Sequence, residues 1–378
     1  MHANRFHNRV PRSEIANNRL RASQIRALGF LSLPRKKVDS QWRSIYTVEI
    51  ALEPAARALW PPTGFRYQTH RKKKVDRMNL DTEVMRPAPG GNGDHPPRKT
   101  IQHRSPCSLD FPRTLRFLLF TVATLAVVPW YGARYGYTAL DWMLFAFFYV
   151  ASSLGITVGY HRLITHRSFQ CPDPVKKLLL IAGGWAIQNS ALRWTADHAR
   201  HHARIDTDED PYDGRRGFWY SHWGWFFRKD PHYTERYAPW LHGDRVVHWQ
   251  QRWFGAIQTS SFALPPLIGY CFGGVERAVA CFLLAGAARV FLVLNITFCI
   301  NSVCHIWGSQ PYSQTNTSRN NFLVALFTFG EGYHNYHHSY PNDYRNGSRW
   351  MDFDPSKWLI FTLSKLGLAH HLIRLRAR

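Results

Sequence analysis

Three short histidine clusters are the residues of this sequence best suited to chemistry. The chain contains 20 histidines, and the clusters read HRLITH, HARHH and HNYHH. On a helix, positions i, i+3 and i+4 lie on one face, so each H-x-x-H-H pattern predicts three imidazoles aimed at one volume. The clusters comprise His161 and His166, then His198, His201 and His202, and finally His334, His337 and His338.

Shared metal ions are the simplest partners for these histidines. A single buried imidazole needs only one hydrogen-bond partner, whereas a gathered set needs a common one. One tetrahedral ion takes four ligands, so the eight clustered histidines lead us to expect two ions. Imidazole ligands are compatible with iron, zinc, copper and nickel. A zinc pair would indicate hydrolysis, but the sequence offers no paired general base. A di-iron centre that activates O₂ for attack on an unactivated hydrocarbon fits better beside long apolar helices.

Four apolar stretches must position these clusters. They cover about 115–131, 140–160, 256–272 and 278–300, and each approaches the roughly 20 residues that a helix needs to cross a bilayer. Buried core helices are the alternative, but the short connections within each pair favour two membrane hairpins. An ionisable side chain is unfavourable in such a segment, so we expect Arg289 to face the protein interior or a polar cavity.

The charge distribution predicts the orientation in the membrane. The formal net charge is +23, with 48 Lys+Arg against 25 Asp+Glu, and Lys and Arg are frequent in 1–114, 161–255 and 302–378. Positively charged segments stay on the cytoplasmic side. We therefore expect an all-α integral membrane protein with four spans and both termini in the cytoplasm. A cytoplasmic helical cap, formed by 161–255 and 302–378, would hold the di-iron site.

The first 110 residues are expected to form a basic, disordered extension that precedes the domain 111–378. The region is rich in Arg, Asn and Pro and includes the run Arg71-Lys72-Lys73-Lys74, a composition typical of disorder. Attraction to nucleic acid or anionic lipid is an alternative, but no nucleic-acid-binding fold surrounds the run. No secretory signal is evident in the first 30 residues. Six cysteines without a C-x-x-C pair or a regular framework indicate neither a zinc ribbon nor a disulfide scaffold, and they favour a reducing compartment.

Five motifs carry a resemblance to a known family. They are GITVGYHRLITHRSF (155–169), DHARHH (197–202), DPYDGRRGFWYSHWGW (210–225), LNITFCINSVCH (294–305) and GEGYHNYHHSYPNDY (330–344). From about residue 115 to 358 the sequence resembles the membrane acyl-CoA desaturases of the delta-9 or stearoyl-CoA type. The resemblance implies that the eight clustered histidines bind two iron ions. It also implies that His305 is a ninth ligand and that Asn301 reaches an iron through water.

The resemblance also implies substrate contacts. Residues near the thioester and CoA would be Asn189, Trp194, Asp197 and the basic pair Arg228 and Lys229, for which attraction to anionic lipid is the alternative. The family's arginine between Trp194 and Asp197 is replaced, because the sequence there reads Trp-Thr-Ala-Asp. Phe298 stands where vertebrate members have tryptophan. Tyr149 and Ser153 correspond to positions at the far end of the acyl tunnel, although interhelical packing would explain either.

The expected function is therefore O₂-dependent insertion of a cis double bond, at the delta-9 position, into a saturated fatty acyl chain carried as acyl-CoA, with another acyl carrier as the alternative. The sequence contains no recognisable haem domain, so we expect a separate electron donor of the cytochrome b5 type, or a ferredoxin with its reductase. The sequence leaves two alternatives open. One is a membrane di-iron hydroxylase, and the other is a membrane-anchored metal- or nucleic-acid-binding protein without enzymatic activity.

Overall fold

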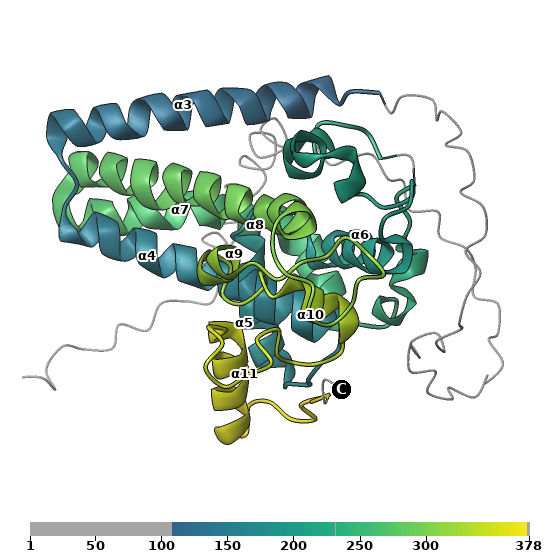
Figure 1. The fold of residues 1–378 in the computed structure, drawn as a ribbon. Coiled ribbons are helices and arrows are strands. Elements are labelled where there is room, and N and C mark those ends of the chain that lie inside the picture. The colour runs from purple at the N-terminus through teal and green to yellow at the C-terminus, as the bar shows by residue number, and fades with distance from the viewer. Residues whose placement is uncertain (1–107, 231, 376–378) are drawn as a thin grey trace, which may run out of the picture. The chain divides into compact units, whose positions relative to one another are not determined.

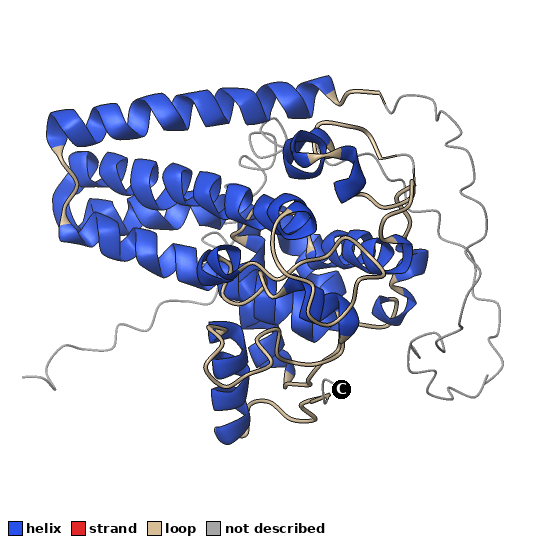
Figure 2. Ribbon diagram, in the orientation of Figure 1, coloured by secondary structure: helices blue, strands red, loops and turns tan. Residues whose placement is uncertain are grey.

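The computed structural model describes residues 108–230 and 232–375, and within them the regular structure is helical (Figure 2). Extended pairing in these residues is limited to isolated bridges, such as Gln170 with His370. The expected disorder of 1–110 lies almost wholly outside the described residues. In chain order the helices are α3 (Phe111–Tyr135), α4 (Ala139–Leu154), η2 (Gly155–Thr165), α5 (Asp173–Gly184), α6 (Ala191–Arg204), η3 (Gly214–Arg216), η4 (Tyr220–Gly224), η5 (Glu235–Tyr237), η6 (Pro239–Leu241), α7 (Arg245–Cys281), η7 (Phe282–Ala288), α8 (Arg289–Ile306), α9 (Phe322–Phe327), α10 (His334–Ser339) and α11 (Pro355–Lys365).

Helices α3 and α4 form the first long pair. The Asp110 side chain caps α3 by accepting a hydrogen bond from the backbone N–H of Arg113 at 3.1 Å, which satisfies one free donor of the first turn. Gly136 ends the helix with φ of 74°, a conformation that glycine adopts without steric penalty. Thr138 then begins the next helix, and its N–H donates to Asp141 at 2.7 Å. The sequence thus makes a short turn between two apolar helices.

Among the residues that the structure describes, three helical segments are long and apolar enough to cross a membrane: Phe111–Tyr135, Ala139–Thr165 and Arg245–Ile306. They contain all four of the predicted apolar stretches. The last segment has 62 residues, and its backbone leaves the helical conformation at Gly273 and Gly274. A Cβ on Gly269 would lie 2.6 Å from the carbonyl oxygen of Arg277, so the chain on the two sides of this break is in close contact. Four spans stay a prediction.

Arg289 faces the protein interior, as the sequence predicts. Its side chain is fully buried and donates to backbone carbonyls of three segments. Nε contacts the oxygen of Ala285 at 3.1 Å, and Nη2 contacts the oxygen of Ser261 at 3.1 Å. Nη1 donates to the oxygen of Trp185. These carbonyls replace the water that a guanidinium would lose at this depth and connect η7 with α7 and the end of α5.

The helices that carry the histidines gather at one end of the long helices (Figure 1). The wide helix η2 continues α4 and packs closely against α5, because a Cβ on Gly155 would lie 2.1 Å from the backbone nitrogen of Gly183. Helix α6 follows, capped by Ser190, which accepts from the N–H of Arg193 at 3.4 Å. Near the C-terminus, the backbone N–H of Ile373 donates to the oxygen of Ser168 at 2.9 Å, so the segment around Ile373 lies beside the first histidine motif.

Candidate metal centre

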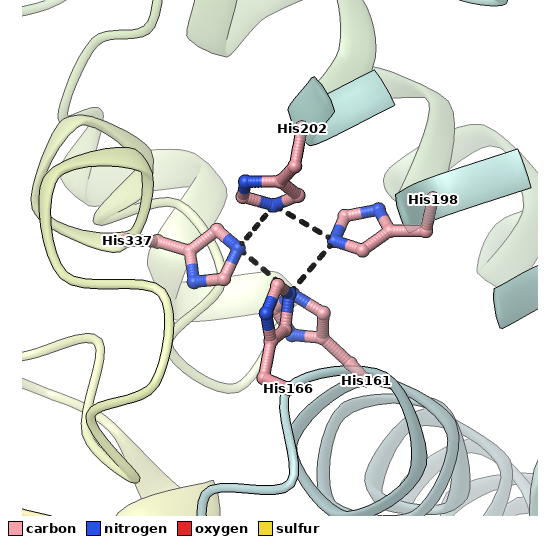
Figure 3. Close-up of side chains that lie close together, drawn as sticks. All are labelled: His161, His166, His198, His202 and His337. Carbon is pink, nitrogen blue, oxygen red and sulfur yellow. Dashed lines mark hydrogen bonds between the residues drawn. The ribbon is translucent and has the colours of Figure 1, made fainter. Parts of the chain in front are cut away.

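Five histidines converge in the first cluster, which Figure 3 shows in close-up. Nε2 of His337 lies 2.8 Å from that of His202 and 3.0 Å from that of His161. Nε2 of His198 lies 3.1 Å from that of His202 and 3.2 Å from that of His166. The ligands come from η2, the turn after it, α6 and α10. Segments far apart in the sequence therefore build this five-histidine cluster.

Four more histidines form the second cluster. Nε2 of His338 lies 3.2 Å from that of His201 and 3.0 Å from that of His334. Nε2 of His334 also lies 3.1 Å from that of His305, which is in the last turn of α8. The structure thus brings His305 into the same group as the histidines of the motifs, where its position in the sequence alone would not place it.

Each H-x-x-H-H triplet divides between the two clusters, so the prediction that one triplet would aim at one volume is wrong. His198 and His202 belong to the five-histidine cluster, whereas His201 belongs to the four-histidine cluster. Helix α10 does the reverse, since its i and i+4 residues join the four-histidine cluster and His337 joins the other. A helix turns by about 100° per residue, so the side chains at i+3 and i+4 point to opposite sides of the side chain at i. A helix that lies between two metal sites can therefore contribute histidines to both.

The converging nitrogens fit metal ions better than they fit one another. A neutral imidazole has one N–H donor and one acceptor nitrogen, so Nε2 makes a single in-plane hydrogen bond. Nε2 of His198 nevertheless lies within 3.2 Å of two others. A cation among the lone pairs would satisfy them together. The residues of both clusters therefore fit a metal centre of two ions with imidazole ligands.

Burial keeps the histidines in the form that binds metal. It lowers the pKa of six of them well below the usual 6.5, and their neighbouring histidines lower it further. Removal from water disfavours the imidazolium form, and only the neutral ring offers a lone pair. These six are His166, His198, His202, His334, His337 and His338.

Buried acids lie behind the rings, and sequence reasoning did not single them out. Oε2 of Glu331 lies 2.7 Å from Nδ1 of His161, although not in line with the ring N–H. Oδ1 of Asp210 accepts a hydrogen bond from Nδ1 of His201 at 2.8 Å. Both acids stand in motifs already noted, GEGYHN and DPYDG. An acid beside a histidine motif is the signal that could have identified them, but nothing in the sequence tells which histidine it meets.

Comparison with known proteins decides the family. Residues 140–349 match the family model described as fatty acid desaturase, and this region contains all nine histidines of the two clusters. The chain belongs to the fatty acid desaturase family. The resemblance inferred from the five motifs is thereby confirmed.

Similar fatty acid desaturases occur in yeasts and mammals. The protein named probable acyl-CoA desaturase from Schizosaccharomyces pombe is 43% identical over 234 residues, which are 61% of this chain and 48% of that protein. Acyl-CoA desaturase 1 of Saccharomyces cerevisiae is 39% identical over 258 residues, or 66% of this chain and 50% of the other. Human stearoyl-CoA desaturase is 37% identical over 251 residues, or 63% and 70%. The chain spans about half the length of the two yeast relatives.

A pocket in this desaturase domain is lined both by apolar residues and by histidines of the two clusters. Its apolar lining includes Ile156, Val293, Ile296, Ile300 and Phe327. Its lining also includes histidines of both clusters and three of the residues predicted from the family: His161, His198, His334, Ser153, Trp194 and Asn301. The ring of Trp194 stacks on that of His198, with centroids 4.8 Å apart. An apolar chain in this pocket would lie next to the metal-binding nitrogens.

Two further predicted tunnel residues lie close to the pocket without lining it. The Tyr149 hydroxyl donates to the backbone oxygen of Phe327 at 2.7 Å, and Phe327 itself lines the pocket. Phe298 is buried, 3% exposed, and its ring packs 5.6 Å from that of Trp225. The structure therefore places Phe298 in an aromatic cluster with residues of η4 and the turn after it.

The residues predicted to contact CoA lie around α6 and the segment after η4. Asn189 is exposed and has φ of 73°. Burial raises the pKa of Asp197 to about 6, against the opposing charges of Arg193 and Arg200. Arg228 pairs through its backbone with Leu109, and Lys229 is exposed. Of the five residues predicted near the thioester and CoA, Trp194 lines the pocket described above, and the other four do not.

Proposed function

We propose that this protein is an O₂-dependent desaturase that introduces a cis double bond into a saturated fatty acyl chain, carried as acyl-CoA. The observation that carries the proposal is the pocket in which apolar side chains line the same space as His161, His198 and His334, residues of both clusters. Relatives named acyl-CoA and stearoyl-CoA desaturase support the substrate class. The overall change removes two hydrogens from adjacent methylenes and, with two electrons and two protons, reduces O₂ to two molecules of water.

The nine clustered histidines are proposed to hold two iron ions. His161, His166, His198, His202 and His337 would bind one, and His201, His305, His334 and His338 the other. When bound, iron supplies the activation of O₂ and the oxidising power for removing hydrogen from an unactivated methylene. Asn301 lines the same pocket, where its amide could hold a water next to the second ion.

The chain's own contribution is to position the substrate. Adjacent methylenes of an acyl chain do not differ chemically, so the double bond forms where the pocket brings one C–C bond to the histidines. Trp194 covers His198 on one side, and Thr297, whose hydroxyl accepts a hydrogen bond from Gln188 at 2.8 Å, lines the pocket nearby. Delta-9 selectivity would follow from the length of chain between this point and the CoA held by Asn189, Asp197, Arg228 and Lys229.

Topology and electron supply complete the proposal. The segment Arg245–Ile306 would cross the membrane twice, turning at Gly273 and Gly274, which gives four spans with both termini and the metal centre on the cytoplasmic side. The domain 111–378 would then carry the activity. Electrons would come from a separate cytochrome b5-type protein, or from a ferredoxin with its reductase, and the net charge of +23 would attract an acidic donor.

The test is a fatty-acid profile of cells that express the full chain together with each type of electron donor. We expect a new monounsaturated acid, and its double-bond position follows from mass spectrometry of derivatives. His337→Ala removes a nitrogen of the five-histidine cluster and should abolish the product. His248→Ala is the matched control, because His248 belongs to neither cluster and its ring nitrogen Nε2 lies 3.2 Å from the backbone oxygen of His242. A hydroxylated acid would identify a hydroxylase, and a product from His337→Ala would contradict the proposed centre.

A further inference from the structure

The acidic loop after α6, residues 205–213, lies behind the four-histidine cluster. It includes residues 210–213 of the DPYDG motif, to which the proposed reaction assigns no role. Asp210 accepts a hydrogen bond from Nδ1 of His201 at 2.8 Å, and both side chains are almost completely buried, 1% and 2% exposed. A carboxylate only accepts hydrogen bonds, so Nδ1 of His201 carries the hydrogen. Its Nε2, which faces the cluster, is left with a free lone pair.

Asp210 is itself held rigidly. Its Oδ1 also accepts from the backbone N–H of Tyr212 at 2.9 Å, and its Oδ2 accepts from that of Asp206 at 3.2 Å. Asp206 has φ of 57°, a conformation that turns the loop back on itself. The carboxylate is therefore fixed from the loop side and presents one direction to the imidazole.

The same loop reaches a second histidine through a hydroxyl group. Nδ1 of His305 lies 2.8 Å from Oγ1 of Thr317, which in turn donates to Oδ1 of Asp206 at 2.6 Å. The backbone N–H of Thr317 also donates to Asp206, at 2.7 Å. A hydroxyl has one hydrogen, and the Thr317 hydroxyl uses it in the hydrogen bond to Asp206. Thr317 must therefore accept from Nδ1–H of His305, which again leaves Nε2 free to face the cluster.

The segment that follows the loop also packs directly under His305. Gly214 begins η3, and a Cβ at this position would lie 2.7 Å from Cβ of His305. Only a residue without a side chain permits so close an approach. Gly214 thus packs against His305 at its Cβ, and Thr317, held by Asp206, contacts His305 at the ring nitrogen Nδ1.

We propose that the loop 205–213 positions the four-histidine metal site, with Asp210 orienting His201 directly and Asp206 orienting His305 through Thr317. The inference rests on the proposed two-ion centre. Ligand histidines that donate their second nitrogen to a carboxylate are fixed in tautomer and orientation, and loss of such a partner lowers metal affinity about 10- to 100-fold. These acids are positioning residues and do not touch the substrate pocket.

The five-histidine cluster has a different support, so the two sites can be separated experimentally. There the acid near a ring nitrogen is Glu331, 2.7 Å from His161. Glu331 is held by Arg162 at 3.0 Å and by Asn346 at 2.7 Å. Neither residue belongs to the loop after α6. Loss of Asp210 or of the Thr317 hydroxyl should therefore weaken one ion and leave the other in place.

The experiment measures iron per protein on the purified full chain across a graded series of chelator concentrations. Wild type should release two ions at high chelator concentration. Asp210→Asn and Thr317→Val should each lose one ion at a roughly 10- to 100-fold lower chelator concentration and retain the second. Thr317→Ser keeps the hydroxyl and should behave as wild type. Asp213→Asn is the matched control, because Asp213 is a buried acid of the same loop that pairs with Arg215 at 2.9 Å.

Three results would overturn the inference, and they differ from one another. If Asp210→Asn and Thr317→Val hold both ions as wild type does, the loop does not position the site. If Asp213→Asn loses iron to the same extent, the acids act only on folding, and thermal unfolding of the metal-free variants would show the same loss of stability in all. If wild type itself binds no iron, the proposed two-ion centre fails, and the inference that rests on it fails as well.

Discussion

Replacing Gly214 by alanine would press a methyl group against the backbone side of His305. The new Cβ would stand 2.7 Å from Cβ of His305 and 3.3 Å from its Cγ, whereas ordinary contacts begin near 3.4 Å. Either η3 or the end of α8 must move by about 0.7 Å, the difference between 3.4 and 2.7 Å. Metal–ligand distances tolerate changes of about 0.2 Å, so we expect the ring to leave its position in the four-histidine cluster.

The magnitude follows from the strain of overpacking. Insertion of a methyl group into a well-packed site costs about 1–3 kcal/mol. If all of this falls on metal binding, the affinity of one ion decreases roughly 5- to 150-fold. The assay is iron retention against a chelator, with thermal unfolding measured in the presence and absence of iron. The variant should show a smaller stabilisation by iron than wild type does.

Gly243→Ala is the control for the glycine substitution itself. No atom lies within 4 Å of a Cβ built on Gly243, so this variant should retain iron as wild type does. Wild-type iron retention together with wild-type stability in Gly214→Ala would refute the reasoning. It would mean that His305 is not held between η3 and the cluster as tightly as the distances indicate.

Three further predictions concern other parts of the site. Glu331→Gln leaves Arg162 with one carboxylate partner fewer in a buried network. It should lower the free energy of unfolding by about 3–5 kcal/mol, measured by calorimetry, and lower the affinity of the five-histidine cluster for its ion, measured as iron per protein. Ser153→Leu fills the apolar pocket and should shift the products toward shorter acyl chains, measured by gas chromatography; an unchanged distribution would exclude Ser153 from the tunnel end. The metal-free protein should lose stability as the pH falls below about 6.5. Six buried histidines have a pKa lowered in the folded state, so the unfolded chain binds more protons than the folded chain in this range. A thermal unfolding temperature that stayed constant across this range would contradict the burial of these histidines as neutral rings.

The long helices could be located from the sequence because their signal is local. The apolar runs beginning near 115 and 140 lie within α3 and the continuous segment of α4 and η2, and the breaks at Gly136 and Gly273 coincide with changes of backbone direction. Hydropathy alone cannot tell whether Arg245–Ile306 counts as one long helix or two, because the change of direction there depends on the backbone of only two glycines.

The distribution of ligands between the two clusters could not be read from the sequence. Spacing places three histidines on one side of a helix, but whether they meet one ion or two depends on what lies opposite, and here α10 lies opposite α6. The partner of His305 shows the same limit, since Thr317 follows it by 12 residues and Asp206 precedes it by 99. Contacts of this kind depend on tertiary packing, for which a single sequence carries no periodic signal.

The exchange of ligands between α6 and α10 has a mechanical consequence. Each helix contributes to both clusters, two histidines to one and one to the other, so a rotation of either helix would disturb both ions at once. The two sites therefore need independent supports that fix each helix against the rest of the fold. The loop after α6 supplies one, through Asp210 and Asp206. The buried network of Arg162 with Glu331 and Asp354 supplies the other, and because Asp354 caps α11 through the N–H of Lys357, the C-terminal region is tied to the five-histidine cluster.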